Sequence, residues 1–483
     1  MKLSPSQKKA LTRIKKFLGS SSDKHILTGA AGTGKTTLVM NVLEYAQKLY
    51  GGSGIWCPEA NTSLNPICVC SPTHKAITHA KNTAIAYFDK DIVFNVDFRT
   101  IHSVLGMFLN VDRASGKGWL NTTDSFLVDA MLHNYKIIIC DEYSMINGTV
   151  LNELLKRQRE FNFKILFVGD INQLPPVGLE ITPVVYHNIF ESVLTDIVRY
   201  DGDLIKIATA ICNDDTIDVN NPFVFYTSDD GMAINYTSRK KWFEAGAEIL
   251  KDLDFRKDPN KVRFLAWRNS VCMKLNRDIR ETIHGYEKAN ENQFLPGDAL
   301  IALKNCEDTE SDSKETILNS CEELTVIEPG IKARSDDDLW DFWIVDAKTI
   351  SESGLERRVR LRILDWNDID RYEKTLKDME TKRDIIQLQS SANSREYKEL
   401  SKEMEDLRYQ FNDVTYAYAI TVHKSQGSTF ENVFIDVEDI KDKRNRTYKK
   451  MLYTAVTRAS KTLHTSCVNE DQRVSIEDFK WEE

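Results

Sequence analysis

Short apolar runs separated by helical patterns dominate the first 190 residues of the chain. The runs are rich in β-branched residues, and polar loop residues follow each of them: 67–71, 136–140 and 163–169. Such runs are typical of parallel strands that are covered on both faces. Two similar runs, 262–267 and 432–437, lie far apart in the second half. The pattern predicts an α/β fold with two layered lobes, the second of them interrupted by an insertion.

Two segments depart from this alternation of strands and helices. Residues 106–128 have a small, glycine-containing centre between apolar flanks, which predicts a β-hairpin that projects from the first lobe. Residues 295–411 form the expected insertion. Its first part contains four runs typical of strands in a small, SH3-like β-barrel: 299–303, 323–328, 341–346 and 358–364.

The second part of the insertion, residues 366–411, has apolar residues at alternating spacings of three and four. The spacing predicts two helices, with seams at Ile369, Tyr372, Leu376 and Met379 and at Tyr397, Leu400, Met404, Leu407 and Phe411. A polar stretch, 390–394, separates them. We predict an antiparallel helical hairpin with arms of about 30 Å. Three roles are open to it: bracing the β-hairpin, binding a partner protein, or only packing on the barrel.

The length and charge of the chain limit its organisation and its partners. At 483 residues it exceeds what one hydrophobic core usually supports, so more than one domain is expected. The formal net charge of −9 argues against non-specific nucleic-acid binding through overall charge. A nucleic-acid partner would therefore have to be held in a local channel.

Cysteine usage and apolar run length indicate the compartment. The nine cysteines show no Cys-x-x-Cys spacing, and the histidines form no zinc pattern. No apolar run approaches the length of a membrane span, and the first residues lead into no signal region. We expect buried free thiols in a cytoplasmic protein without a membrane partner.

A glycine-rich loop follows the short apolar run 25–28 and precedes an amphipathic helical pattern. Its spacing, Gly29-x-x-x-x-Gly34-Lys35-Thr36, predicts a phosphate-binding loop for ATP with Mg²⁺. Backbone amides at a helix N-terminus can bind phosphate oxygens, Lys35 can reach the β and γ phosphates, and the Thr36 hydroxyl can ligate magnesium. The residues expected at the nucleotide are Gly29, Ala30, Ala31, Gly32, Thr33, Gly34, Lys35, Thr36 and Thr37.

Two later strands end in residues suited to hydrolysis. Asp141 and Glu142 follow the run 136–140, where Asp141 can hold the magnesium and Glu142 can orient or deprotonate the attacking water. Gln173 lies in the loop after 163–169. Its amide can hydrogen-bond both a γ phosphate and a neighbouring lobe, which suits a sensor of the nucleotide.

Eight motifs occur in the order found in the superfamily 1 helicases. They are Gln7, GAAGTGKT (29–36), SPTHKA (71–76), TIHS (100–103), DEYS (141–144), GDINQLPPV (169–177), VHKSQGST (422–429) and LYTAVTRA (452–459). The arrangement resembles the RecD-like branch, and within it the Dda-type helicases of tailed phages. The resemblance implies two RecA-like P-loop lobes with ATP between them. The lobes are then 1–190, with the hairpin, and 191–294 plus 412–483, with 295–411 inserted in the second.

The resemblance also assigns further nucleotide contacts. Gln7 would read the adenine, and Arg199 and Arg458 would come from the second lobe as arginine fingers. The fixed fork of an arginine can bridge phosphate oxygens while it stays charged. Gln426 and Gly427 lie in a loop that could touch both ATP and nucleic acid. Arg199 departs from the family pattern in that Tyr200 follows it, where relatives often have a polar residue.

Loops after strands in both lobes face the single strand in members of this family. Hydroxyls and imidazoles there can bond phosphates without adding formal charge. The expected contacts are Pro72, Thr73, His74, Thr100, His102, Thr421 and His423. The 106–128 hairpin matches the strand-separating pin, with Trp119 or Phe108 as the aromatic that stacks on the last base pair. Packing of Trp119 onto its own lobe is the alternative.

The function implied is that of an ATP-dependent DNA helicase that travels 5′→3′ on single-stranded DNA and unwinds forked duplexes in phage-type replication or recombination. A monomer is expected, with replication proteins as further partners. Two alternatives stay open: an RNA helicase or remodelling ATPase on the same frame, and a clamp that binds ATP and nucleic acid without turnover. No motif in the sequence recognises a 2′-hydroxyl, so the sequence does not separate DNA from RNA as the substrate. The clamp is disfavoured because Lys35, Asp141, Glu142 and Arg458 are all present.

Overall fold

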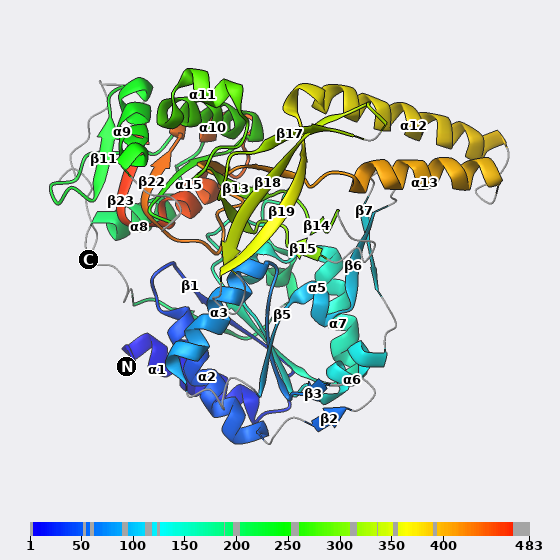
Figure 1. Cartoon of the computed structure of the whole chain (residues 1–483). Coiled ribbons are helices and arrows are strands. Elements are labelled where there is room, and N and C mark those ends of the chain that lie inside the picture. The colour runs from blue at the N-terminus through cyan, green and yellow to red at the C-terminus, as the bar shows by residue number, and fades with distance from the viewer. Residues whose placement is uncertain are drawn as a thin grey trace.

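The computed structural model describes most of the chain. The described residues are 3–51, 55–57, 62–88, 95–111, 118–122, 126–187, 189–196, 203–252, 260–309, 316–335, 337–350, 356–389 and 394–466. They form two parallel sheets with helices on their faces, one above the other in Figure 1, and an antiparallel sheet attached to the second.

The first lobe is built on a six-stranded parallel sheet. In spatial order its strands are β10 (Glu191–Leu194), β1 (Lys24–Gly29), β9 (Lys164–Gly169), β8 (Ile137–Cys140), β4 (Ile67–Ser71) and β5 (Val96–Thr100). Its helices are α1 (Pro5–Leu18), α2 (Lys35–Tyr50), α3 (His74–Tyr87), α5 (Ile101–Val104), α6 (Phe126–Asn134) and α7 (Gly148–Phe161). Short 3₁₀ turns are η2 (Tyr143–Met145) and η3 (Pro183–His187).

Successive side chains of a strand point to opposite faces of this sheet, and helices cover both faces. In β8, Ile137 and Ile139 join the core under α1, α2 and α3, whereas Ile138 and Cys140 join the core under α5, α6 and α7. All four are fully buried. A continuous apolar run is what a strand with two buried faces requires, and the predicted strands of this lobe are confirmed.

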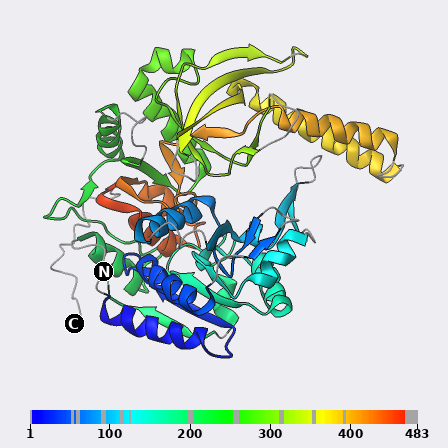
Figure 2. The ribbon, with the colours of Figure 1, turned by 60° about the horizontal axis from the view of Figure 1, so that its bottom comes forward.

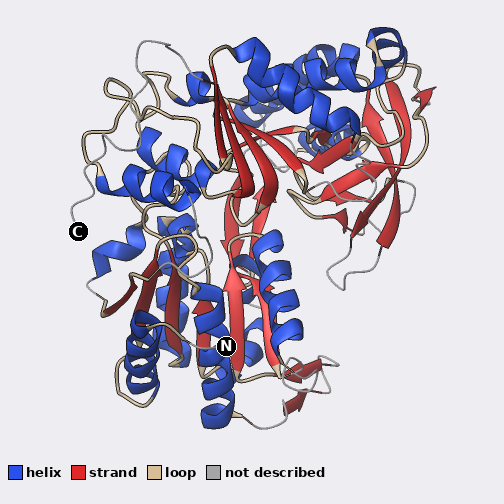
Figure 3. Cartoon of the chain, turned by 90° about the vertical axis from the view of Figure 1, so that its left-hand side faces the viewer, coloured by secondary structure: helices blue, strands red, loops and turns tan. Residues whose placement is uncertain are grey.

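The second lobe has a five-stranded parallel sheet. Its order is β11 (Ala233–Tyr236), β23 (Ala459–Ser466), β22 (Phe430–Ile435), β12 (Val262–Ala266) and β21 (Ala419–Thr421). Its helices are α8 (Asp203–Asn213), α9 (Arg239–Asp252), α10 (Asn269–His284), α11 (Tyr286–Glu291), α14 (Val437–Ile440) and α15 (Tyr448–Val456). Figure 3 shows the strands of the two lobes as separate groups. The distant strand pair predicted for this lobe, β12 and β22, is adjacent in its sheet.

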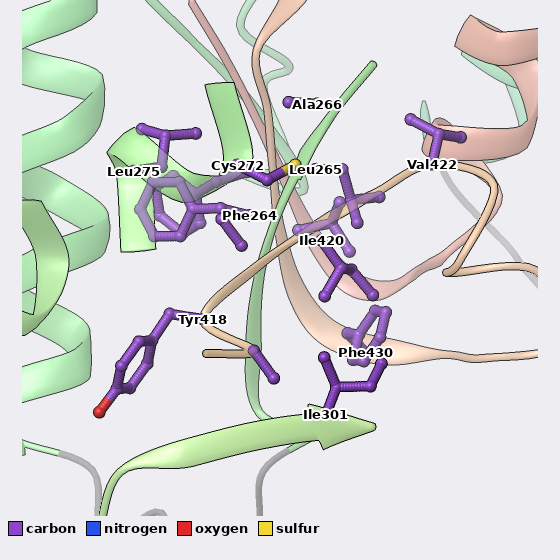
Figure 4. Close-up of a cluster of buried hydrophobic side chains, with 14 of the residues drawn as sticks. Phe264, Leu265, Ala266, Cys272, Leu275, Ile301, Tyr418, Ile420, Val422 and Phe430 are labelled. Atoms are coloured by element: carbon purple, nitrogen blue, oxygen red, sulfur yellow. The ribbon is translucent and has the colours of Figure 1, made fainter. Parts of the chain in front are cut away.

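The inserted segment forms an antiparallel sheet that shares the core of the second lobe. Its strands are β13 (Ala299–Ala302), β16 (Glu323–Val326), β17 (Ile331–Arg334), β18 (Asp341–Ile350), β19 (Glu356–Leu364) and β20 (Val414–Tyr416), with a small ribbon β14 (Cys306–Glu307) and β15 (Thr316–Leu318) beside it. Among the described strands no pairing closes the sheet into a ring. One buried cluster contains Phe264 of β12, Ile301 of β13 and Ile420 of β21 (Figure 4).

The predicted domain boundaries need three corrections. Strand β10 pairs with β1, so the first lobe continues beyond residue 190. Strand β20 pairs with β13, so the insertion continues beyond residue 411. The hairpin strands are β6 (Met107–Val111) and β7 (Gly118–Thr122), and helix α6 takes the last residues of the predicted segment. The two missed strands, β10 and β20, are short, and β10 alternates exposed and buried positions, so each gives little apolar signal. Strands β2 (Ile55–Cys57) and β3 (Thr62–Leu64) form a further ribbon.

The predicted helical hairpin is an arm that extends away from the lobes (Figures 1 and 2). It follows the turn η4 (Trp366–Asp368) and consists of α12 (Ile369–Gln389) and α13 (Arg395–Tyr409). The helices have 21 and 15 residues, so only α12 reaches about 30 Å at ~1.5 Å per residue. The β6–β7 hairpin points towards this arm in both views.

The sequence predicts that the chain has no membrane-spanning segment and that its cysteines are buried free thiols. Within the described residues no helix combines the length and apolar character that crossing a membrane requires. The cysteines described as free are Cys68, Cys70, Cys140, Cys212, Cys272, Cys306 and Cys321. Five of these seven are buried, as predicted.

Candidate active site

The phosphate loop connects β1 to α2 in the strand–loop–helix order that the motif requires. Gly32 and Gly34 have φ values of +81° and +76°, a backbone region that favours glycine. A Cβ on Gly29 would lie 2.6 Å from Oγ1 of Thr33, so this position also needs glycine. Lys35 Nζ donates to the main-chain oxygens of Gly29 (2.7 Å) and Ala30 (3.1 Å). The ammonium therefore lies over the start of the loop, where it can exchange these oxygens for phosphate oxygens.

Gln7 is held against the loop by its own amide. Its Nε2 donates to the main-chain oxygen of Thr33 (2.9 Å), and its Oε1 accepts from the main-chain nitrogen of Ser4 (2.9 Å). The Ser4 hydroxyl accepts from the main-chain nitrogen of Gln7 (3.3 Å), which completes a capping box at the start of α1. A Cβ on Gly34 would meet Gln7 Nε2 at 2.4 Å. In this structure Gln7 therefore fixes the shape of the loop.

Asp141 and Glu142 follow β8 at the same sheet edge as the loop. Burial, and after it the charge of Glu142, raises the pKa of Asp141 to about 7, against the opposing charge of Lys35. Glu142 has a left-handed backbone (φ +55°), and its Oε2 is buried without a hydrogen-bond partner in the described structure. Two crowded carboxylates, one with an orphaned oxygen, favour a cation between them and a phosphate.

The structure offers oxygen ligands for such a cation but no complete protein site. Across the described ranges no group of three or more His, Cys, Asp and Glu side chains could hold a metal ion. Thr36 lies on the first turn of α2, and Asp141 comes directly after β8, which β9 separates from β1 in the sheet. A hydroxyl and one carboxylate suit Mg²⁺, which usually takes its other ligands from phosphates and water. The donor set therefore fits a magnesium–nucleotide complex.

The loop after β9 lies at the interface between the lobes. Asp170 is buried and accepts from the main-chain nitrogen of Asn172 (3.0 Å). Gln173 is buried, and its Oε1 has no hydrogen-bond partner among the described groups. Leu174 is bonded by the second lobe on both sides: its nitrogen donates to Oγ1 of Thr454 (3.0 Å), and its oxygen accepts from Nε2 of Gln426 (3.0 Å). The predicted sensor segment therefore contacts the second lobe directly.

Tyr453 of α15 connects the second lobe to the phosphate loop. Its hydroxyl accepts from the main-chain nitrogen of Ala31 (2.8 Å) and donates to Oδ2 of Asp170 (2.6 Å). Burial, and after it the charge of Asp170, raises the pKa of Tyr453 well above its usual value, so the phenol stays protonated. One hydroxyl of the second lobe thus bonds two segments of the first lobe that flank the nucleotide position.

Arg458 comes directly after the same helix and is turned towards its own lobe. Its Nε donates to Thr454 O (3.0 Å), Nη1 to Ser428 O (3.2 Å) and Nη2 to Thr457 Oγ1 (3.0 Å). Thr457 lines a cavity of about 380 Å³ together with Gly29, Ala30 and Ala31. The end of α15 and the phosphate loop therefore line one cavity, but Arg458 itself is buried outside this lining, and its role as an arginine finger stays a prediction.

The expected strand contacts of the first lobe cluster after β4 and β5. Thr73 caps α3 by accepting from Ala76 N (3.3 Å), and Thr100 caps α5 by accepting from Ser103 N (3.2 Å). Burial lowers the pKa of His102, and His74 contributes to the shift, so the two imidazoles lie near each other. Both threonine hydroxyls accept cap bonds, and a hydroxyl that accepts one bond can still donate its proton to a phosphate.

The corresponding residues of the second lobe follow β21. Thr421 accepts from the main-chain nitrogen of Lys424 (3.4 Å), and burial lowers the pKa of His423. Gly427 has a φ of +74°, and a Cβ there would lie 3.4 Å from Cβ of Ala76. This close approach brings the strand-contact loops of both lobes together. Pro72 precedes the first of them.

Three predicted side chains cannot be placed. Arg199 lies outside the described residues. The backbone of Trp119 pairs with Asn110 in the hairpin, but the side chains of Trp119 and Phe108 lie outside the described part. The assignments of a second arginine finger and of a base-stacking aromatic stay predictions.

Sequence reasoning missed the residues that join the lobes. Tyr453 and Asp170 lie within motifs used for the resemblance, yet neither received a role. A phenol within the largely apolar run 451–456 was the available signal, because a phenol hydroxyl in a core needs a polar partner. That partner is 283 positions away in the chain, and no local pattern reports such a distance.

Two regions of the chain match known family models. Residues 15–179 match a family described as an AAA domain, and residues 416–464 match the UvrD-like helicase C-terminal domain. The first region holds the phosphate loop and the second holds α15.

Whole-chain comparisons agree with these matches. An uncharacterized protein of Acanthamoeba polyphaga mimivirus is 25% identical over 517 residues, covering 95% of this chain and 98% of that protein. The ATP-dependent DNA helicase dda of Enterobacteria phage T4 is 25% identical over 486 residues, covering 94% of this chain and 97% of that protein. The crystal structure of Pif1 helicase from Candida albicans has a similar fold, with a TM-score of 0.50 and 17% identity over 98% of this chain and 96% of that one.

Proposed function

We infer from the family matches and the relatives, Dda and RecD among them, that this chain belongs to the superfamily 1 helicases. From that premise we propose that it is an ATP-dependent DNA helicase. It moves 5′→3′ along single-stranded DNA and separates duplex strands. The observation that carries the proposal is the Tyr453 hydroxyl, bonded to Ala31 and Asp170 across the lobe interface. A helicase requires this kind of link, because nucleotide turnover must alter the relation between two lobes that hold one strand.

The phosphate loop binds the triphosphate through its own residues. The amides at the start of α2 bind phosphate oxygens, and Lys35 exchanges the oxygens of Gly29 and Ala30 for the β and γ phosphates. Thr36 and Asp141 would hold Mg²⁺, which would neutralise phosphate charge when bound. Gln7 keeps the loop in shape through Thr33, whatever contact it makes with the base.

Hydrolysis needs a base, a sensor of the γ phosphate and a cation that offsets the negative charge on the transferred phosphoryl group. Glu142 has an unpartnered carboxylate oxygen available to orient the attacking water. The free Gln173 oxygen can accept from the same water, and its loop is fixed to the second lobe through Leu174. Arg458 leaves the oxygens of its own lobe for the γ phosphate when the lobes close. In that position its fork offsets the developing negative charge.

Movement along DNA requires that the two strand grips alternate. Thr73, His74, Thr100 and His102 hold the strand from the first lobe, and Thr421 and His423 hold it from the second. The β6–β7 hairpin separates the duplex ahead of them. We further propose that the protein works as a monomer in the cytoplasm, in replication or recombination, with replication proteins as partners.

Unwinding of tailed duplexes tests this function directly. A labelled duplex with a 5′ or a 3′ single-stranded tail is incubated with ATP, with and without Mg²⁺, beside matched RNA duplexes. The proposal expects strand release from the 5′-tailed DNA only with ATP and Mg²⁺. Release from the 3′-tailed DNA alone would refute the polarity. Equal activity on RNA would refute the DNA preference, and no release with ATP would refute the helicase assignment.

A further inference from the structure

Three parts of the fold meet at a charged cluster that the nucleotide site does not use. Lys75 comes from the first turn of α3, Arg263 from β12 of the second lobe and Glu323 from β16 of the inserted sheet. Lys75 Nζ lies 2.7 Å from Oε1 of Glu323, and Arg263 Nη2 lies 2.8 Å from Oε2. One carboxylate is therefore shared by cations from both lobes.

The two cations are held to different extents. The Arg263 side chain is fully buried and also donates to the main-chain oxygen of Ala417, whereas the Lys75 side chain is 32% exposed. Both face the ring of Phe430, with Arg263 Cζ at 4.8 Å and Lys75 Nζ at 5.5 Å from its centroid. Phe430 belongs to the buried cluster of Figure 4. A buried arginine is costly without its counter-ion, so Lys75 is the partner that can leave.

Glu323 stays charged whichever partner it has. Burial raises its pKa, but the charges and hydrogen bonds of Arg263 and Lys75 outweigh burial and hold the pKa at about 2. When Lys75 leaves, the carboxylate keeps its bond to Arg263. The departure of Lys75 therefore leaves no buried charge without a counter-ion, so the exchange has a low free-energy cost.

Lys75 lies where strand-contact segments of both lobes converge. It follows Thr73 and His74 directly in the chain. The segment of the second lobe that contains Gly427 packs against Ala76, the next residue along α3. Under the proposed function, a single strand that touches both lobes would pass this position. The cluster has two cations and one anion, so it carries local positive charge in a chain with a net charge of −9.

We propose that Glu323 acts as an internal substitute for a nucleic-acid phosphate at Lys75, and that a backbone phosphate of the bound strand displaces it. The inference rests on the proposed function and adds a charged strand ligand to the uncharged contacts described above. Carboxylate and phosphate accept the same charge-assisted hydrogen bonds from an ammonium. With Glu323 ready to take Lys75 back, the protein can release each phosphate as the strand moves on.

Equilibrium binding of a fluorescent oligothymidylate, followed by anisotropy over a range of salt concentrations, tests the exchange. Lys75→Gln removes the ligand and Glu323→Gln removes its competitor while retaining an oxygen for Arg263. We expect Lys75→Gln to weaken binding and to reduce the slope of log affinity against log salt by about 0.7. We expect Glu323→Gln to tighten binding by about two- to fivefold. The double variant should behave like Lys75→Gln.

A matched pair elsewhere in the inserted sheet provides the control. Lys348 and Glu356 form a 2.7 Å ion pair between β18 and β19, and Lys348→Gln or Glu356→Gln should leave affinity and slope unchanged. If Glu323→Gln weakens binding, or if Lys75→Gln keeps the wild-type slope, the exchange is refuted. Should Glu323→Gln fail to fold in a thermal melt, the Lys75→Gln slope decides alone. A wild-type protein that binds no oligothymidylate refutes the proposed function, whereas a binding wild type with unmoved variants refutes only the exchange.

Discussion

Lys35 and Arg458, the two cations expected at the phosphates, are both bonded to oxygens of the protein itself. Under the proposed function, nucleotide binding at this site would be an exchange of partners. Each cation would give up main-chain or hydroxyl oxygens and gain charged phosphate oxygens, which form stronger hydrogen bonds. The gain is largest where negative charge develops in the transition state, so these cations should affect turnover more than affinity.

Lys35→Ala should reduce ATP turnover by at least about a hundredfold, because it removes the ammonium that stabilises the negative charge on the transferred phosphate. Steady-state phosphate release in the presence of single-stranded DNA measures the effect. Lys48→Ala is the matched control, since Lys48 lies on the same helix and only forms an exposed ion pair with Glu44. Equal turnover by Lys35→Ala and wild type would show that the phosphate loop is misassigned.

Tyr453→Phe should uncouple the lobes without emptying the nucleotide site. Loss of the hydroxyl leaves the buried Asp170 without its donor and Ala31 N without its acceptor, at a cost of about 1–3 kcal/mol. We expect the stimulation of ATP turnover by single-stranded DNA to fall about tenfold. Tyr286→Phe, at an exposed position, should keep full stimulation. Unchanged stimulation in Tyr453→Phe would remove the tyrosine from the coupling.

The elements that sequence reasoning located are those whose pattern is set by burial. Strands β4, β8 and β9 are central and covered on both faces, so each is a continuous apolar run that can be read directly. The missed strands β5, β10 and β11 lie at sheet edges and carry polar positions. Strand β23 lies inside its sheet, but its polar side chains are satisfied by distant partners, as when Thr465 donates to Asn235. Such pairs leave no local signal.

The arm illustrates the same limit at a helix. Its predicted seam is confirmed in part: Leu400 and Met404 are buried, and Met379 and Tyr397 pack against them. The spacing missed Ile386, which completes this cluster, and included Leu376, which belongs to neither cluster of the arm. The distal cluster is separate from the core of the lobes.

Met404→Ala should loosen the arm and leave the lobes intact. The side chain is fully buried, so its truncation costs about 2–5 kcal/mol within a small local cluster. Hydrogen exchange should accelerate in α12 and α13 but not in β8 or β22. Leu388→Ala, at a position 88% exposed, is the control and should change nothing. Faster exchange throughout the second lobe would show that the arm supports the lobe core.

His464 should make the second lobe sensitive to acid. Burial lowers its pKa from 6.5 to about 4, and its ring stacks on Phe434 with centroids 4.0 Å apart. Between pH 6.5 and pH 4, His464 is therefore protonated in the unfolded chain but neutral in the folded chain. Its contribution to the free energy of unfolding is complete above pH 6.5 and falls as the pH is lowered towards 4. At pH 5 the loss is about 2 kcal/mol. His464→Gln should abolish that part of the loss.

Hydrogen exchange of β22 and β23 at pH 7.5 and pH 5 measures this effect after correction for the intrinsic rates. The wild-type protein should lose protection at the lower pH, and the glutamine variant should lose less. His284→Gln is the comparison, since its imidazole pairs with Asp298 instead of being buried in the sheet. Equal losses in wild type and His464→Gln would exclude the histidine as the cause.

Across the whole molecule, the distribution of the cores indicates which parts move together. One continuous cluster joins the second lobe to the inserted sheet, whereas the first lobe has two clusters of its own. The two bodies meet through hydrogen bonds and an ion pair at Tyr453, Thr454, Gln426 and Lys75, and through Leu174 of the first lobe, which is buried in the cluster of the second. Such directional contacts have defined made and broken states, so nucleotide turnover can shift the lobes as rigid bodies.

We propose that hydrolysis needs groups from both lobes, and the Arg458→Lys variant distinguishes this from catalysis by the first lobe alone. Lysine keeps the charge but loses the fork that bridges phosphate oxygens. With saturating ATP and single-stranded DNA, we predict that turnover falls at least about a hundredfold while ATP affinity changes only a few-fold. Arg444→Lys, at an exposed position of the same lobe, should retain wild-type turnover. Wild-type turnover by Arg458→Lys would contradict the claim that the second lobe takes part in catalysis.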